Sequence, residues 1–228
     1  MTAQVQLAGN GFGGLVQGNY GNYQAAADGT FTVDTRDAPS MLTLGMAYVK
    51  QVNTSYTTPA APAAAGVGAI VASAALSDGT LSIAASPDVM RPVAVEVNPG
   101  TAAITAGNLA VTYEGNDGQT LTENVSLICK ASAPFTNLLS RGVVTVSSAI
   151  ITALAGGHSP FVRLNTTAAI SAPVDPGAQD VAFTREYDDG ATIAVGAASV
   201  ALGSIPPTTA PNGTHTYSFV YSYIAPTS

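Results

Sequence analysis

The segment that most constrains the fold is NLAVTYEGNDGQTLTENVSLI, residues 108–128. Apolar residues alternate with polar ones along both of its halves, as they do in half-buried strands. The residues expected on the buried face are Leu109, Val111 and Tyr113 in the first half and Leu121, Val125 and Leu127 in the second. Between the halves lies Asn116-Asp117-Gly118, whose residue types tolerate positive φ. The segment therefore predicts a β-hairpin with one face in a core.

Similar strand patterns recur on both sides of this hairpin in the chain. Further strands are expected at TLSIAA (80–85), RPVAVEV (91–97), PFVRLNTT (160–167), AFTREY (182–187), TIAVGAASVALG (192–203) and THTYSFVYSYI (214–224). Residues 143–157 fit either strands or a helix, and their β-branched density favours strands. The 14 prolines and 23 glycines separate these segments at the spacing expected of a sandwich. The sequence predicts a mainly β chain built as an antiparallel β-sandwich.

Composition divides the chain into three parts. Residues 1–52 are expected to form a small N-terminal β-rich module, and residues 69–228 the β-sandwich domain. Residues 53–68 between them are predicted to be a Pro/Ala-rich linker or arm, because TTPAAPAAAG lacks any periodicity.

Within the N-terminal module, short strands are expected at residues 4–7 and 30–33. Residues 37–45, DAPSMLTLG, predict a compact helix, with Asp37 as the N-cap and Gly45 just past the end.

Charged residues make up only 9% of the chain, against about 25% in an ordinary soluble domain. Neutral polar side chains must therefore cover much of the surface, or the surface is buried against partners. The net charge of −7, with seven scattered basic residues, argues against a nucleic-acid partner. The N-terminus lacks the pattern of a signal peptide, and the uncharged stretch at residues 51–77 is too weakly apolar to span a bilayer. We expect neither nucleic acid nor membrane as a partner.

The glycine-dense stretch LAGNGFGGL, residues 7–15, matches a dinucleotide-binding spacing through Gly9, Gly11 and Gly14. Such a motif needs a strand before it and a helix after it, within a βαβ unit. The following residues show no helical periodicity, so no cofactor is expected. The stretch is instead interpreted as a permissive loop that orders on a neighbouring subunit, with Phe12 as its anchor.

Acidic residues gather in REYDDGA, where Asp188 and Asp189 precede Gly190 and Glu186 lies nearby. A calcium loop requires alternating oxygen ligands, which this spacing does not provide. The segment is therefore predicted to be a solvated turn, and no metal site is expected. Glu114 and Asp117, which flank the hairpin turn, are likewise interpreted as ordinary turn residues.

The remaining reactive side chains also lack the setting that catalysis requires. Cys129 is expected to be a small buried or half-buried thiol, and a single cysteine excludes an internal disulfide. His158 and His215 are predicted to be separate surface or turn residues, and no G-x-S-x-G motif is present. No catalytic residues are assigned, and the chain is predicted not to be an enzyme.

The most suggestive local pattern is a row of aromatic residues near the C-terminus. The residues that alternate onto one face of the expected strand are Tyr217, Phe219, Tyr221 and Tyr223. Such a row can be the inner face of a sandwich, a subunit interface, or a flat platform for sugar rings. With Phe12, these four residues are the candidate interface residues.

Two stretches of the chain resemble bacteriophage proteins. DVMRPVAVEVNPG followed by GNLAVTYEGNDGQTLTENVSLI is similar to β-sandwich domains of tailed-phage virion proteins. YQAAADGTFTVDTRDAPSMLTLG resembles a short module of phage head-associated proteins. Together the likeness covers about residues 20–45 and 88–165, and it brings no catalytic residues.

This resemblance implies a structural protein of the virion, assembled in the host cytoplasm. The most specific role implied is decoration or cementing of the capsid, through contacts with the major capsid protein or other virion subunits, as a homo-oligomer. A tail-tube, head–tail connector or fibre-base component is an alternative within the particle. A carbohydrate-binding adhesin module is the alternative from a different class.

Overall fold

The computed structural model describes residues 2–6, 23–25, 30–34, 49–193 and 203–226. The chain divides into two compact units, Met1–Gln51 with Pro226–Ser228, and Val52–Ala225. Within the described residues every regular element is a strand, so the expected mainly β fold is confirmed. No helix in this described part is long and apolar enough to cross a membrane.

The first unit contains a three-stranded antiparallel sheet in the order β1-β3-β2. Its strands are β1 (Thr2–Gln6), β2 (Tyr23–Ala25) and β3 (Thr30–Asp34). The strands expected at 4–7 and 30–33 correspond to β1 and β3. The glycine stretch with Phe12, and the helix expected at 37–45, lie outside the described residues.

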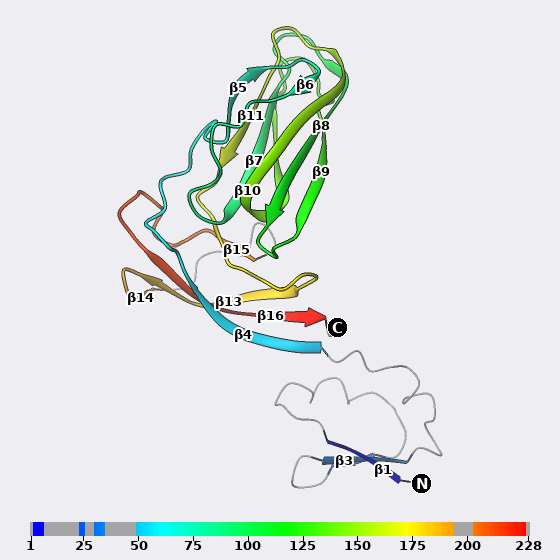
Figure 1. Cartoon of the computed structure of the whole chain (residues 1–228), viewed down its shortest axis with the longest axis vertical. Coiled ribbons are helices and arrows are strands. Elements are labelled where there is room, and N and C mark those ends of the chain that lie inside the picture. The colour runs from blue at the N-terminus through cyan, green and yellow to red at the C-terminus, as the bar shows by residue number, and fades with distance from the viewer. Residues whose placement is uncertain (1, 7–22, 26–29, 35–48, 194–202, 227–228) are drawn as a thin grey trace. The chain divides into compact units, whose positions relative to one another are not determined.

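The second unit is dominated by a seven-stranded sheet in the order β5-β11-β7-β10-β8-β9, with β6 also paired to β10 (Figure 1). Its strands are β5 (Val71–Ala75), β6 (Gly79–Thr80), β7 (Arg91–Asn98), β8 (Ile104–Gly115), β9 (Thr120–Ser126), β10 (Phe135–Gly156) and β11 (Phe161–Thr166). All of their pairings are antiparallel. The hairpin predicted at 108–128 is confirmed as β8 and β9, and residues 143–157 lie in β10 but for Gly157.

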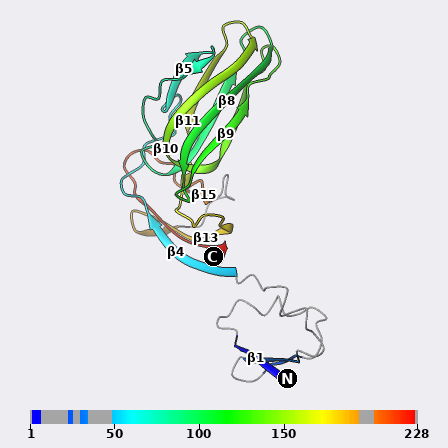
Figure 2. The same cartoon turned by 45° about the vertical axis from the view of Figure 1, so that its right-hand side comes forward.

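Strand β10, a long strand of the large sheet in Figure 2, has 22 residues and pairs along its length with β7, β8 and β6. Residues 135–143 pair with β7, and residues 143–156 pair with β8. A register shift between Leu138 and Gly142 marks the first of several irregularities along it. Such irregularities bend a strand and increase its twist. The single strand therefore joins the two halves of the sheet.

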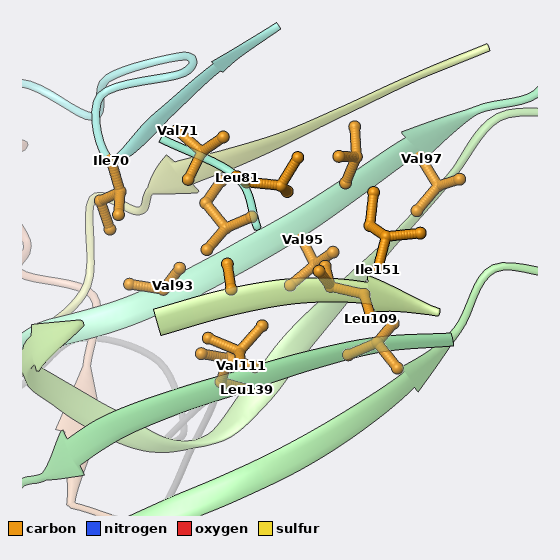
Figure 3. Close-up of a cluster of buried hydrophobic side chains, with 14 of the residues drawn as sticks. Ile70, Val71, Leu81, Val93, Val95, Val97, Leu109, Val111, Leu139 and Ile151 are labelled. Atoms are coloured by element: carbon orange, nitrogen blue, oxygen red, sulfur yellow. The ribbon is translucent and has the colours of Figure 1, made fainter. Parts of the chain in front are cut away.

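The main core lies between these halves. Val93, Val95 and Val97 of β7 belong to the same buried cluster as Leu109 and Val111 of β8 (Figure 3). These are the alternating residues that the sequence pattern places on the inner face, because successive strand residues point to opposite sides.

The prediction of a strand at residues 80–85 is wrong for most of that range, because only Gly79–Thr80 pairs with another strand, as β6. Beyond it, the N–H of Leu81 donates to Ala149 O and that of Ala84 donates to Ile70 O. These two bonds join the segment to different parts of the sheet, so it cannot continue a single ladder. Its alternation arises because Leu81 is buried in the main core and Ile83 packs against it.

A four-stranded sheet has the order β14-β13-β16-β4. Its strands are β4 (Val49–Thr57), β13 (Gln179–Asp188), β14 (Ala191–Ile193) and β16 (Tyr217–Pro226). A short pair joins β12 (Ile170–Ser171), which follows β11 in the chain, to β15 (Ser204–Ile205), which precedes β16. Of the strand expected at 192–203, residues 194–202 lie outside the described part.

The segment predicted as a linker or arm, residues 53–68, contains the second half of β4 and the Pro/Ala-rich stretch. That stretch is hydrogen-bonded to the rest of its own unit. The N–H of Ala63 donates to Asp88 Oδ2 at 2.6 Å, and the N–H of Gly66 donates to Thr166 Oγ1 at 2.9 Å. The N–H of Thr166 donates in return to Gly66 O at 3.0 Å. The stretch therefore has fixed attachment points on its own chain.

Candidate functional site

The outward side of β10, β8 and β9 carries a regular array of small side chains, which we call the polar face. The registers align its twelve residues in four rows: Thr152–Asn108–Ser126, Ile150–Ala110–Asn124, Ser148–Thr112–Thr122 and Thr145–Glu114–Thr120. None of them is buried, whereas Leu109, Val111 and Tyr113 alternate with them into the core. The same alternation that builds the core thus builds this surface.

Side chains on the polar face bond to one another across the strands. Thr112 Oγ1 lies 2.9 Å from Thr122 Oγ1, and Asn108 Nδ2 donates to Asn124 Oδ1 at 3.4 Å. Cross-strand pairs of this kind contribute about 0.2–1 kcal/mol each to a sheet. Because the β-branched threonines already have restricted χ1 rotation, little side-chain entropy remains to be lost when a partner binds.

Charge is nearly absent from the polar face, since Glu114 is the one ionisable residue among the twelve. Ile150, at 38% exposure, is its one large apolar side chain. At its margin, β9 has a hydrogen-bonded neighbour on one side only among the described strands. Residues 120–126 contain neither lysine nor proline, two residues that commonly protect such edges from pairing. The face and its edge suit contact with another protein surface.

The outward side of the other half of the sheet differs in carrying an ion pair. Arg163 donates from Nε and from a terminal nitrogen to the two oxygens of Glu96, at 2.7 and 2.6 Å. Asn165 Nδ2 also donates to Glu96, at 2.9 Å. The bonds from Arg163 lower the pKa of Glu96 below its ordinary value, and Asn165 adds to the effect. This side therefore has its polar groups already engaged with each other.

The aromatic row on β16 is buried within the chain. Tyr217, Phe219, Tyr221 and Tyr223 are each at most 6% exposed, and they pack with apolar side chains that include Phe183. The hydroxyl of Tyr221 donates to Pro173 O. Burial raises the pKa of Tyr221, with smaller contributions from neighbouring groups that include Tyr223. Of the three alternatives for this row, core packing agrees with its burial, because a sugar or a subunit cannot reach it. The fifth candidate, Phe12, lies outside the described residues.

The hairpin turn expected between the strands is confirmed between β8 and β9, and its first two residues are buried. Asn116 is 3% exposed and Asp117 is 7% exposed. Asn116 Nδ2 donates to Ala172 O at 2.8 Å, its N–H donates to Gly142 O, and its carbonyl accepts from Val174 N. Sequence reasoning missed this contact because the turn's residue types indicate a β-turn whether or not it is solvated. Glu114 lies on the polar face.

A second cluster, which we call the acid–histidine cluster, consists of Asp188, Asp189 and His215. Asp189 and Gly190 have φ of +48° and +83° and form the two-residue turn between β13 and β14, as expected of this segment. His215 Nδ1 lies 2.8 Å from Asp189 Oδ2 and 3.1 Å from Asp188 Oδ1. His215, expected to be a surface or turn residue separate from His158, lies just before β16 and pairs with two carboxylates, a contact that the sequence did not predict.

The pKa values of His215 and Asp189 both shift toward the charged form. The pKa of His215 is raised, mainly by its bond to Asp189. The pKa of Asp189 is lowered, first by the backbone N–H of Thr216 and then by His215. Glu186, considered with these acids in the sequence, accepts instead from Thr208 N and Oγ1, at 2.7 and 3.1 Å. It is fully buried.

The two other reactive side chains considered in the sequence are those of Cys129 and His158. Cys129 is half-buried, as expected, and burial raises its thiol pKa, so the thiol is neutral near pH 7. His158 is exposed, and its residue forms an isolated bridge with Gly100.

Comparison with known proteins leaves the family open. Neither protein-family models, curated proteins nor solved structures give a match to this chain.

Proposed function

We propose that this chain is a non-enzymatic structural protein of a tailed-phage particle, which decorates or cements the capsid as a homo-oligomer. The observation that carries the proposal is the polar face on β10, β8 and β9. The low charge of the whole chain and the resemblance of two segments to phage virion proteins support it.

The chemistry of the polar face favours a protein partner. Charged residues are depleted from the centres of protein interfaces, because stripping water from them is costly. Hydroxyl and amide groups at fixed spacing can instead bond to backbone and side-chain groups of a neighbour. Along its outer edge β9 pairs with no other described strand, so an extended segment of a capsid subunit can add a strand there.

The size of the polar face fits repeated attachment to a lattice. A stable interface takes about 20–30 residues from each partner, whereas the polar face has twelve. One such contact alone is therefore expected to bind its partner only weakly. An oligomer that engages several capsid subunits at once gains affinity through effective concentration, without any further contact.

The aromatic row and the Pro/Ala-rich stretch are weaker candidates for the adhesive surface. The aromatic side chains are buried in their own unit. The stretch is bonded to Asp88, Arg91 and Thr166 of the same chain. Adhesion through these groups would require them to leave their present partners, so the polar face is the better candidate.

The test is binding of the purified full chain to phage heads that lack decoration. We expect the wild-type protein to co-sediment with heads and to raise their resistance to heat. Thr122→Arg places a charge in the middle of the polar face and should abolish binding. Thr136→Arg is the matched control, because Thr136 is also exposed but pairs with Glu96 of β7 on the other half of the sheet.

Three results would contradict the proposal: wild-type protein that does not bind heads, equal binding by both variants, or normal head stability in a phage that lacks the gene. Hexameric or dodecameric rings of the pure protein would favour the tail-tube or connector alternative. Binding on a glycan array that Thr122→Arg removes would favour the adhesin alternative.

A further inference from the structure

The acid–histidine cluster brings together three side chains of types that bind metals, two from the end of β13 and its following turn and one from just before β16. Asp188 ends β13, Asp189 lies in the following turn, and His215 lies two residues before β16. One ligand atom from each, two carboxylate oxygens and the imidazole nitrogen, lie within 4.8 Å of one another. The side chain of Asp189 is held in place, because its other oxygen accepts from Thr216 N at 2.9 Å and Thr216 Oγ1 at 3.2 Å.

The polar groups around this cluster are incompletely satisfied by the described residues. Asp188 Oδ1 is shielded from solvent and has no hydrogen-bond partner of good geometry there, although it lies 3.1 Å from the imidazole. Tyr217 pairs directly with Asp188 in the β13–β16 register, so both side chains project from the same face. Tyr217 is fully buried, and its hydroxyl also lacks a partner within the described part. Asp188 and Asp189 both raise the pKa of this hydroxyl after burial, which places their charges near it.

The charges within the cluster are also unbalanced. Two carboxylates oppose one imidazole, so even a protonated His215 leaves one negative charge uncompensated. A divalent cation would neutralise both carboxylates together with a neutral imidazole. The buried Tyr217 hydroxyl is then placed near a water or carboxylate oxygen of the coordination sphere, to which it could donate.

We propose that Asp188, Asp189 and His215 form a binding site for a zinc-class divalent cation. One nitrogen and two oxygen ligands suit Zn²⁺, which takes tetrahedral ligands at about 2.0–2.2 Å. Ligand atoms of such a site are separated by about 3.3 Å. The distances from His215 Nδ1 of 2.8 and 3.1 Å are close to that separation. Ca²⁺ is disfavoured because it requires six to eight oxygen ligands.

A cation there would tie the β13–β14 turn to the beginning of β16. Three protein ligands leave the fourth tetrahedral position for water or for a group from another subunit. This proposal does not depend on the virion role, because it rests on a different part of the molecule from the polar face.

The test is a calorimetric titration of untagged, chelator-treated full chain with ZnCl₂, with CaCl₂ as the comparison. We expect one Zn²⁺ per chain and no measurable Ca²⁺ binding. His215→Ala and Asp188→Asn should each weaken Zn²⁺ binding at least tenfold. His158→Ala is the matched control, because it removes the other histidine of the chain and should leave binding unchanged.

Absence of stoichiometric Zn²⁺ binding to the wild type, or unchanged binding by His215→Ala, would overturn the proposal. The Co²⁺ spectrum of the wild type gives an answer that does not depend on how any variant folds. Intense visible bands are expected from a four-coordinate site. A weak spectrum typical of six water-like ligands would count against it.

Discussion

Arg91 and Ala63 are joined by two hydrogen bonds, in which both terminal nitrogens of the guanidinium donate to one carbonyl oxygen at 3.2 Å. Arg91 also donates to Thr167 O at 3.1 Å and pairs with Asp88 at 2.7 Å. Its side chain is fully buried, and burial lowers its pKa while Asp88 opposes that shift. One side chain thus attaches the Pro/Ala-rich stretch to the beginning of β7.

Replacement of Arg91 should therefore destabilise the second unit. Arg91→Ala leaves the carbonyl oxygens of Ala63 and Thr167 without their donor, and a buried polar group left without its partner costs about 1–3 kcal/mol. We expect a lower free energy of unfolding in urea and faster proteolysis within residues 59–66. Arg185→Ala, at an exposed position, is the control and should change stability by under about 0.5 kcal/mol. Equal losses in the two variants would contradict the role given to Arg91.

The buried turn at Asn116 makes a prediction about a single-atom change. Asn116→Asp replaces the amide donor that faces Ala172 O with a carboxylate oxygen, so two acceptors meet in a buried place. We expect a loss of at least about 1–3 kcal/mol in chemical denaturation. Asn124→Asp makes the same change on the exposed polar face, and we expect it to have little effect. A stable Asn116→Asp protein would show that this contact does not hold the turn.

The ion pair between Glu96 and Arg163 predicts a pH dependence. The folded-state pKa of Glu96 lies below its ordinary value of 4.5, so the pair stabilises the fold above that pH. This contribution is lost as pH falls through the folded-state pKa. The stability difference between wild type and Glu96→Gln should therefore shrink between about pH 6 and pH 3. Urea unfolding at both pH values measures it, and a constant difference would exclude this linkage.

The aromatic row gives a prediction that separates core packing from surface binding. Tyr221→Ala opens a cavity among Phe183 and Tyr223 and should cost about 3–5 kcal/mol. Tyr221→Phe keeps the ring but loses the bond to Pro173 O, so we expect about 0.5–1.5 kcal/mol. Calorimetric unfolding measures both. A Tyr221→Ala protein as stable as wild type would restore the interface and platform alternatives.

Much of the sheet was predictable because its information is local. Residues 108–128 carry both the alternation and the turn residues, and together these fix a register without any distant contact. At residues 80–85 the same kind of alternation does not correspond to a strand. There the alternating Leu81 and Ile83 satisfy the core, while the backbone bonds go to separate parts of the chain.

The two candidate sites were harder to predict because neither is local. Each residue of the polar face is ordinary in sequence, and only the register across β10, β8 and β9 shows that charge is nearly absent from a whole surface. Likewise, His215 and Asp189 are 26 residues apart and meet only because β13 pairs with β16. The interpretation of Phe12 as an anchor stays a prediction.

Strand β10 has a consequence for how the large sheet comes apart. Because β10 hydrogen-bonds to β7 through one half of its length and to β8 through the other, loss of β10 would remove a paired strand from both halves of the sheet. Unfolding of this region should accordingly be a single cooperative event, with amide protons along β7, β8 and β10 exchanging together. The outer strands β5 and β9 can detach without breaking that shared strand, since neither pairs with it. Any exchange of strands with a neighbouring subunit is thereby confined to the two margins of the sheet.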